Sequence, residues 1–220
     1  GGPAQWPQWI ETKGKLGTQT PFATDTITIP FENPYGTLFF ITAHDFFSDG
    51  TAAIATMTGE VWLLKGIDEK LETIRWKRFA TGLHQSLGLK IVKDKLYVLG
   101  RDQITCLHDL NGDDEADFYE CVTNAMQTSP GGHDFLVGLE TDKEGRWYFA
   151  SGNQGVCRIN KVGQTFLDVL ATGFRNPNGL GISPDGRFIT TSVQEGDWTP
   201  ATSICQIELG KNEGAHFGAG

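Results

Sequence analysis

Short apolar segments alternate with tight polar turns along the chain, and this pattern recurs four times. The turns are Asp49-Gly50, Asp94-Lys95, Glu144-Gly145 and Asp185-Gly186, and the apolar or aromatic segments after them are 52–55, 96–99, 147–150 and 188–191. Segments of this length between turn residues indicate β-strands. No stretch keeps the helical apolar period for long, so the pattern predicts an all-β protein.

The repeating unit has the length of a propeller blade. A further strand closes each unit, ending near Leu64, Leu107, Ile159 and Ile207, and the turns of successive units lie 45, 50 and 41 residues apart. That period is typical of the blades of a β-propeller. One stretch also repeats in detail, since Ala-Thr-Gly at 80–82 and Gly-Leu at 88–89 recur at 171–173 and 179–180. We expect about four blades over residues 38–220, as part of a larger ring, with 1–37 as a linker or a strand that closes another blade. The segment 214–218 is expected to lead into a further blade.

Composition and charge limit the classes of partner that we expect this chain to bind. The 220 residues include 28 glycines, as many turns require, and 27 acidic against 18 basic residues give a net charge of −9. An acidic chain lacks the clustered Lys and Arg that nucleic acids need. The longest apolar run, 37–43, is far below the length of a membrane span. We therefore expect neither a nucleic-acid partner nor a span in this chain.

The four cysteines, Cys106, Cys121, Cys157 and Cys205, form no C-x-x-C pair. This spacing excludes a zinc ribbon, a thioredoxin motif and a covalent haem attachment site. Cys106 and Cys121 flank an acidic loop and could meet across a hairpin. Buried free thiols and a disulfide both stay open.

The acidic loop that starts at Asp109 has oxygen donors at the positions used by calcium-binding loops. Side chains are supplied by Asp109, Asn111, Asp113, Asp117 and Glu120, and a backbone carbonyl by Glu115. Ca²⁺ takes six to eight hard oxygens, and alternate residues of a curled loop point inward. Asp114 stands where the sharp turn prefers glycine. Because the flanks are predicted strands, the site would be a structural calcium site in a hairpin loop; the alternative is a solvated acidic turn.

Polar residues precede the predicted innermost strands of three blades. They are His84-Gln85, His133 and Arg175-Asn176. Propeller symmetry should bring them together at the axis, where they suit an anionic or carbonyl-bearing ligand with a histidine as base. The alternative is that they only cap the channel through hydrogen bonds.

Two longer strings resemble soluble sugar dehydrogenases that use pyrroloquinoline quinone, which are six-bladed propellers. His133 with Gly138-Leu139 and the run 147–155 is similar to the region of their catalytic histidine, and Gly173-Phe174-Arg175-Asn176-Pro177-Asn178-Gly179-Leu180 to their cofactor-binding segment. A closer likeness is to the propeller region of large membrane-bound or haem-containing dehydrogenases, named by inference, of planctomycete-type bacteria. The strings 59–62, 101–105 and 196–201 carry it.

This resemblance implies a role for each residue. His133 would take the hydroxyl proton during hydride transfer, and Arg175 and Asn176 would hold the quinone, with His84 and Gln85 nearby. The carbonyls of Gly196 and Asp197 would bind a bridging calcium. Further basic cofactor ligands come from later blades in that family, and this chain lacks them.

Two functions follow as expectations. The first is the propeller of a periplasmic or otherwise extracytoplasmic quinone-dependent dehydrogenase acting on a sugar or polyol, with calcium and pyrroloquinoline quinone as cofactors. The second is a non-catalytic, calcium-stabilised propeller that serves as a binding or assembly module for other subunits or for missing blades.

Overall fold

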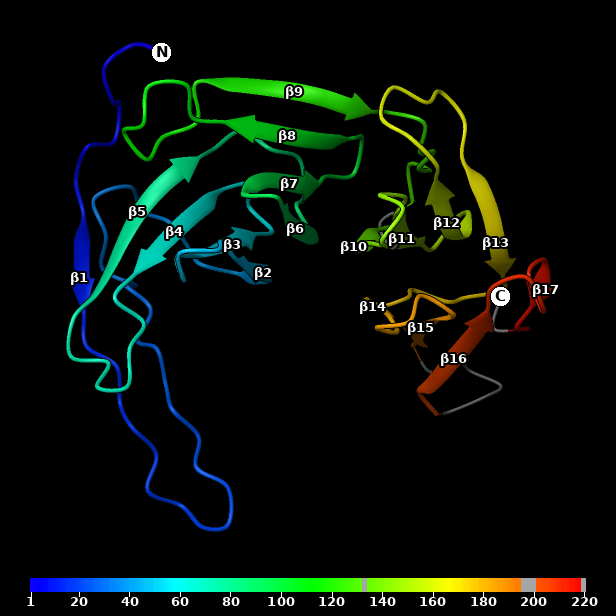
Figure 1. Ribbon diagram of the computed structural model, residues 1–220, viewed down its shortest axis with the longest axis horizontal. Helices are drawn as coiled ribbons and strands as arrows, with labels where there is room; N and C mark the ends of the chain where they lie inside the picture. The colour runs from blue at the N-terminus through cyan, green and yellow to red at the C-terminus, as the bar shows by residue number, and fades with distance from the viewer. Residues whose placement is uncertain (132–133, 195–200, 219–220) are drawn as a thin grey trace.

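The fold consists of β-strands without helices in the residues that the computed structural model describes, which are 1–131, 134–194 and 201–218. The strands form four sheets, each of which is one blade of a β-propeller. The blades follow one another along an arc, with β2, β6, β10 and β14 toward the middle and β5, β9 and β13 toward the rim (Figure 1). The predicted all-β class and the four blades are confirmed.

Blades 1 and 2 are antiparallel sheets. Blade 1 has the order β1-β5-β4-β3-β2, from β1 (Ile10–Thr12), β2 (Ile41–Phe46), β3 (Ala52–Thr56), β4 (Val61–Lys65) and β5 (Ile74–Ala80). Blade 2 has the order β6-β7-β8-β9, from β6 (Gly88–Val92), β7 (Lys95–Leu99), β8 (Ile104–His108) and β9 (Phe118–Thr123). The N-terminal segment thus adds a fifth strand to the outer edge of blade 1.

Blades 3 and 4 share the C-terminal part of the chain. Blade 3 has the order β10-β11-β12-β13-β17, from β10 (Leu136–Thr141), β11 (Trp147–Ser151), β12 (Gly155–Ile159), β13 (Asp168–Thr172) and β17 (Ala215–His216). Blade 4 has the order β14-β15-β16, from β14 (Leu180–Ile182), β15 (Phe188–Val193) and β16 (Ser203–Glu208). Residues 215–216 lie parallel to β13, so the segment expected to lead into a further blade packs on blade 3.

The hydrophobic core lies mostly between blades, because the middle strands are buried on both faces. The clusters join Leu63 and Phe79 to Leu96, Cys106 and Val122 to Trp147, and Leu170 to Ile189. Strands buried on both faces read as continuous apolar runs rather than as an alternation. A fourth cluster packs β3, β4 and β5 against the N-terminal segment.

A backbone hydrogen bond recurs at each of the three blade junctions. In each case the loop that follows the third strand of one blade donates an N–H to the outer strand of the preceding blade. The bonds are Ala116 N to Phe79 O (2.8 Å), Gly163 N to Val122 O (2.9 Å) and Gly214 N to Leu170 O (2.6 Å). Residues 209–217 therefore take the place in blade 4 that 109–117 and 160–167 take in blades 2 and 3.

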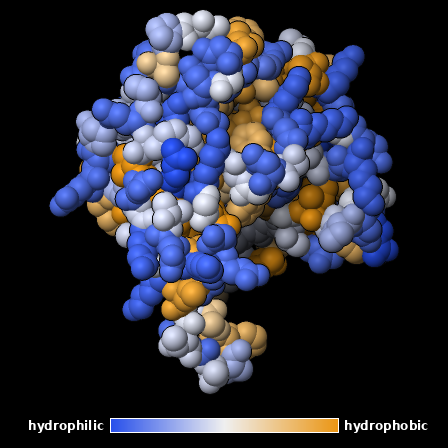
Figure 2. Space-filling view, turned by 60° about the vertical axis from the view of Figure 1, so that its left-hand side comes forward, coloured by the Kyte–Doolittle hydropathy of each residue, from blue (hydrophilic) through white to orange (hydrophobic). Residues whose placement is uncertain are grey.

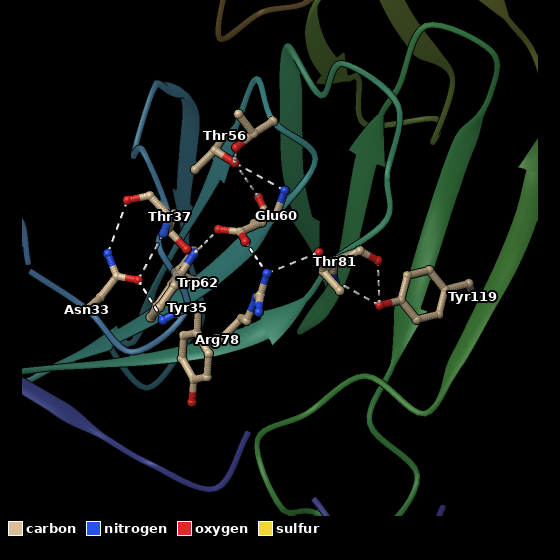
Figure 3. A network of polar contacts seen from close by, with 10 residues as sticks. Asn33, Tyr35, Thr37, Thr56, Glu60, Trp62, Arg78, Thr81 and Tyr119 are labelled. Atoms are coloured by element: carbon tan, nitrogen blue, oxygen red, sulfur yellow. Dashed lines mark hydrogen bonds and ion pairs between the residues drawn. The ribbon is translucent and has the colours of Figure 1, made fainter. Parts of the chain in front are cut away.

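Arg78 on β5 binds the N-terminal segment to the outer face of blade 1 (Figure 3). Its guanidinium pairs with the buried carboxylate of Glu60, which also accepts a hydrogen bond from Trp62 Nε1 (3.0 Å). The guanidinium also lies 5.0 Å from the ring centre of Trp6 and 4.9 Å from that of Tyr35. This buried ion pair is stabilised by the Trp62 hydrogen bond to the carboxylate and by the two aromatic rings at the guanidinium, whereas Arg78 Nε is buried without a hydrogen-bond partner among the described residues.

The segment between β1 and β2 extends away from the blades as a lobe at the bottom of the view (Figures 1 and 2). The face in Figure 2 is mostly hydrophilic, with separate hydrophobic patches. In the described part of the chain, no helix is long and apolar enough to cross a membrane.

Candidate functional site: an axial cavity

A cavity of about 810 Å³ lies where the inner strands of all four blades converge. Its polar lining consists of amide and hydroxyl side chains: Thr42, Asn176, Asn178, Ser192, Gln194 and Thr202. Ile41, Met57, Leu87 and Phe135 are among the apolar lining residues, and the ionisable ones are His44 and Glu140. Within the described residues, neither lysine nor arginine lines the cavity. This described lining therefore offers many hydrogen-bonding groups and no fixed cation.

Glycines allow the inner strands to approach closely enough to form this wall. A Cβ on Gly88 would lie 3.0 Å from the Leu139 side chain, and one on Gly138 would lie 2.7 Å from the backbone nitrogen of Leu180. Gly138 also has a φ of 64°, which strains other residues. The repeated Gly-Leu pairs in the sequence thus mark the contacts between neighbouring inner strands.

Charged residues continue the cavity wall along the inner strands of blades 1 to 3. Lys90 Nζ lies 2.8 Å from Glu140 Oε2 and 3.7 Å from Asp45 Oδ2. Burial opposes the charged ammonium, but these two carboxylates outweigh it and raise the pKa of Lys90. Lys90, beside the lining, therefore compensates the charge of Glu140, which belongs to the lining.

The residues predicted to converge at the cavity mouth do so only in part. Asn176 lines the cavity, and its Nδ2 donates to Gln194 Oε1 (2.7 Å). Gln85 accepts a hydrogen bond from Arg101 Nη1 (3.1 Å) and lies outside the lining. His84 and Arg175 are exposed and also lie outside it. The backbone conformation nevertheless repeats at these positions, since Gln85 and Asn176 both have positive φ, at 49° and 39°.

His133, Gly196 and Asp197 lie outside the described residues, so the predicted base and calcium carbonyls stay predictions. The chain just before His133 is held by Arg101. The Arg101 Nη2 group donates to the carbonyls of Ser129 (3.0 Å) and Gly131 (2.8 Å). Arg101 is thus a positioning residue for this loop.

The described lining does not fit pyrroloquinoline quinone. The quinone carries several carboxylates and needs cationic partners, whereas the lining contains the carboxylate of Glu140 and no lysine or arginine. The guanidinium of Arg175, which was expected to supply the charge, is exposed outside the lining. The cofactor therefore stays a prediction from resemblance.

The acidic loop is held by hydrogen bonds and lysines. The Asp109 carboxylate accepts from four backbone N–H groups, at 111–114. Lys65 pairs with Asp114 (2.8 Å), and Lys77 donates to the Asp113 carbonyl. The Glu115 carboxylate accepts from the N–H groups of Gln5 (2.7 Å) and Trp6 (3.1 Å), so it binds the N-terminal segment.

Two further ligands of the predicted calcium set face other groups. Asp117 accepts from the N–H of Leu110 (2.8 Å), and Glu120 lies on β9 with its carboxylate 2.7 Å from His108 Nε2. Asn111 donates to Asp113 Oδ2 (3.1 Å), and Asp113 Oδ1 is buried without a hydrogen-bond partner among the described residues. That oxygen is compatible with a bound cation, whereas the two lysines compete with one. Calcium stays a prediction from ligand spacing.

All four cysteines are free thiols, so the open choice is decided against a disulfide between Cys106 and Cys121. Strand register explains this, because Cys106 lies opposite Glu120 and Cys121 lies opposite Thr105. The two thiols therefore do not form a cross-strand pair.

Several residues in or beside the cavity lining have a recognisable signal in the sequence. Glu140 of the lining and its partner Lys90, which lies outside the lining, each follow a Gly-Leu pair in an otherwise apolar strand. Gln194 lies next to a segment singled out only by resemblance. Thr42 has no distinctive signal in the sequence.

Comparison with known proteins supports the fold. No protein-family model matches the sequence, and no curated protein is significantly similar to it. Among solved structures, an inferred oxidoreductase (glucose dehydrogenase) of Thermus thermophilus has a TM-score of 0.61 at 17% identity, covering 81% of this chain and 63% of its own. A family AA12 carbohydrate-active enzyme of Trichoderma reesei has a TM-score of 0.59 at 13% identity, covering 99% and 61%.

An inferred 6-phosphogluconolactonase of Bacteroides uniformis is also similar, with a TM-score of 0.51 at 10% identity, covering 77% of this chain and 55% of its own. The chain thus spans less than two thirds of the length of these three structures. At such low identities the likeness establishes architecture and not activity. The chain has the four-bladed arrangement of a β-propeller similar to those of dehydrogenase-like and lactonase-like proteins.

Proposed function

We propose that the axial cavity binds a neutral polyhydroxylated small molecule, a sugar or polyol, as part of an extracytoplasmic oxidoreductase. The observation that carries the proposal is a lining rich in amides and hydroxyls and free of lysine and arginine in the described residues. Amide groups both donate and accept, as the hydroxyls of such a ligand require. Phe135 and Met57 add apolar surface for the carbon face of a sugar ring.

The catalytic half of the proposal rests on the resemblance. His133 would act as the base that takes a proton from the ligand's hydroxyl group, and the resemblance names pyrroloquinoline quinone with calcium as the electron acceptor, although the described lining does not fit that cofactor. Arg101 supports this role indirectly, because it fixes the carbonyls of the residues that precede His133.

Direct binding tests the first half. We expect a sugar or polyol from a small panel to bind in calorimetric titration, and Asn176→Ala to weaken that binding by about tenfold, the loss of one or two hydrogen bonds. Gln85→Ala is the matched control, because Gln85 has the equivalent backbone position but lies outside the cavity. Failure of every sugar and polyol to bind would overturn the proposal.

Activity tests the second half. After reconstitution with quinone and calcium, the ligand that binds should reduce a redox dye, and His133→Ala should abolish this while leaving binding intact. Binding without dye reduction would keep the sugar site and remove the dehydrogenase.

The alternative is a non-catalytic binding or assembly module for other subunits or blades. One observation favours it: Gln85 is occupied by Arg101, and His84 and Arg175 do not reach the cavity. This function predicts neither sugar binding nor dye reduction.

A further inference from the structure

Three metal-ligating side chains of different chemistry meet on blade 2, away from the axial cavity. Cys106 and His108 are two residues apart on β8 and so share a face, and Glu120 lies directly opposite Cys106 on β9. One ligand atom from each of the three lies within 4.8 Å of the others. His108 Nε2 and Glu120 Oε2 are already 2.7 Å apart.

From this cluster we propose a zinc site formed by the Cys106 thiolate, the His108 imidazole and the Glu120 carboxylate. Zn²⁺ accepts sulfur, nitrogen and oxygen ligands, whereas Ca²⁺ takes oxygen ligands. The site therefore differs from the calcium loop predicted nearby. It uses Glu120 as a zinc ligand, because strand register places this residue beside the Cys106 thiol.

The geometry needs only small movements. With ordinary zinc bond lengths, neighbouring ligands of a tetrahedral site are roughly 3.3–3.6 Å apart. The His108–Glu120 contact has to open slightly, and Cys106 Sγ has to close on them. Glu120 has the freedom to do so, because 45% of its side chain is exposed, and water supplies the fourth ligand.

The surroundings hold the Cys106 sulfur in place, but burial and the nearby Glu120 carboxylate raise the pKa of its thiol, so the metal ion has to displace the proton. The Cys106 residue is 1% exposed, within the core between blades 2 and 3. Tyr97 lies opposite Cys106 on β7, and its ring is 4.7 Å from that of Trp147, which fixes it in place. A hydroxyl beside a metal-bound sulfur can donate a hydrogen bond to it. On binding, the S–Zn bond forms, the S–H bond breaks, and the thiol proton passes to the solvent.

Cobalt substitution tests the site, because a thiolate bound to Co²⁺ gives a charge-transfer absorption that zinc removes by competition. We expect the full chain, freed of metal by chelation, to show this absorption with one equivalent of Co²⁺. Cys106→Ser should abolish it, and Glu120→Gln should weaken Co²⁺ binding by at least about tenfold. Cys121→Ser is the control and should leave it unchanged, since Cys121 is the exposed neighbour of Glu120.

Misfolding of Cys106→Ser would also remove the signal, so Glu120→Gln serves as a second test. The Glu120 side chain is partly exposed, and circular dichroism checks that this variant is folded. The proposal is overturned if the unmodified chain gives no thiolate absorption, if the absorption survives Cys106→Ser, or if Glu120→Gln binds Co²⁺ as tightly as the unmodified chain.

Discussion

The ammonium of Lys90 lies between carboxylates of the two neighbouring blades, 2.8 Å from Glu140 and 3.7 Å from Asp45. This contact joins three inner strands at the wall of the axial cavity. All three side chains are about one quarter exposed, so solvent only partly screens the two ion pairs that Lys90 makes.

Removing this cation should destabilise the propeller. Lys90→Met leaves two carboxylates facing each other, and we expect a loss of about 1–3 kcal/mol in the free energy of unfolding. Urea denaturation measures it. Lys143→Met, at an exposed position, is the control and should cost less than about 0.5 kcal/mol. Equal losses in the two variants would mean that Lys90 does not link the blades.

Two glycines with similar backbone conformations separate strain from crowding. Gly138 and Gly145 have φ values of 64° and 78°, but a Cβ on Gly138 would meet Leu180, whereas one on Gly145 would meet nothing within 4 Å. We expect Gly145→Ala to cost about 1 kcal/mol and Gly138→Ala a further 1–3 kcal/mol or so. Thermal or urea unfolding tests this, and similar costs would argue against close packing of β10 on β14.

Asp142 should make blade 3 sensitive to acid. Burial raises its pKa, but hydrogen bonds from the backbone and side chain of Arg146 and from the Tyr148 hydroxyl (2.8 Å) outweigh this and hold the pKa below its ordinary value of 3.8. A carboxyl with a lowered pKa in the folded state stabilises the fold above the pKa of the unfolded chain. That contribution is lost as the pH falls below about 4 through the folded-state pKa.

We therefore expect Asp142→Asn to cost about 1–3 kcal/mol at neutral pH and to flatten the loss of stability below pH 4. Unfolding measured across pH 2–7 tests this. The exposed neighbour Glu144 is the comparison, and Glu144→Gln should keep the slope of the unmodified chain. A slope unchanged by Asp142→Asn would contradict the assignment.

Calcium binding to the acidic loop is expected from ligand spacing, with the buried, unpartnered Asp113 Oδ1 as the oxygen available to the ion in the described part of the chain. Ca²⁺ should then raise the melting temperature of the chain and a chelator should lower it. In Asp113→Asn both shifts should shrink. If neither addition nor chelation moves the melting temperature, Lys65, Lys77 and the backbone hydrogen bonds hold the loop alone.

The strands were predictable because turn residues and apolar runs act locally. Residues 96–99 and 147–150 fall within β7 and β11, since short polar turns, of two residues before β7 and five before β11, fix where each strand starts. Blade number followed from the period. The sheet that each outer segment joins could not be predicted in this way, because β17 binds β13 through backbone contacts that any sequence can make.

Side-chain partners were less predictable than strands. His84, Gln85 and Arg175 have the right place in the repeat, but a repeat specifies where the backbone goes and not which way a long side chain turns. Arg101, from a neighbouring turn, captures Gln85. Glu120 likewise fits calcium spacing along the chain, whereas the register of β8 and β9 places it beside Cys106 and His108.

The hydrogen bonds from Ala116, Gly163 and Gly214 each reach back to the blade before their own. The backbone hydrogen bonds of a blade's outer strand are therefore complete only when the next blade has formed. Coupling limited to adjacent units makes stability a sum of single-blade and junction terms, as in repeat proteins. A mutation in blade 3 should accordingly expose amides in blades 2 to 4 to hydrogen exchange and leave blade 1 protected, so damage spreads along this propeller by one unit at a time.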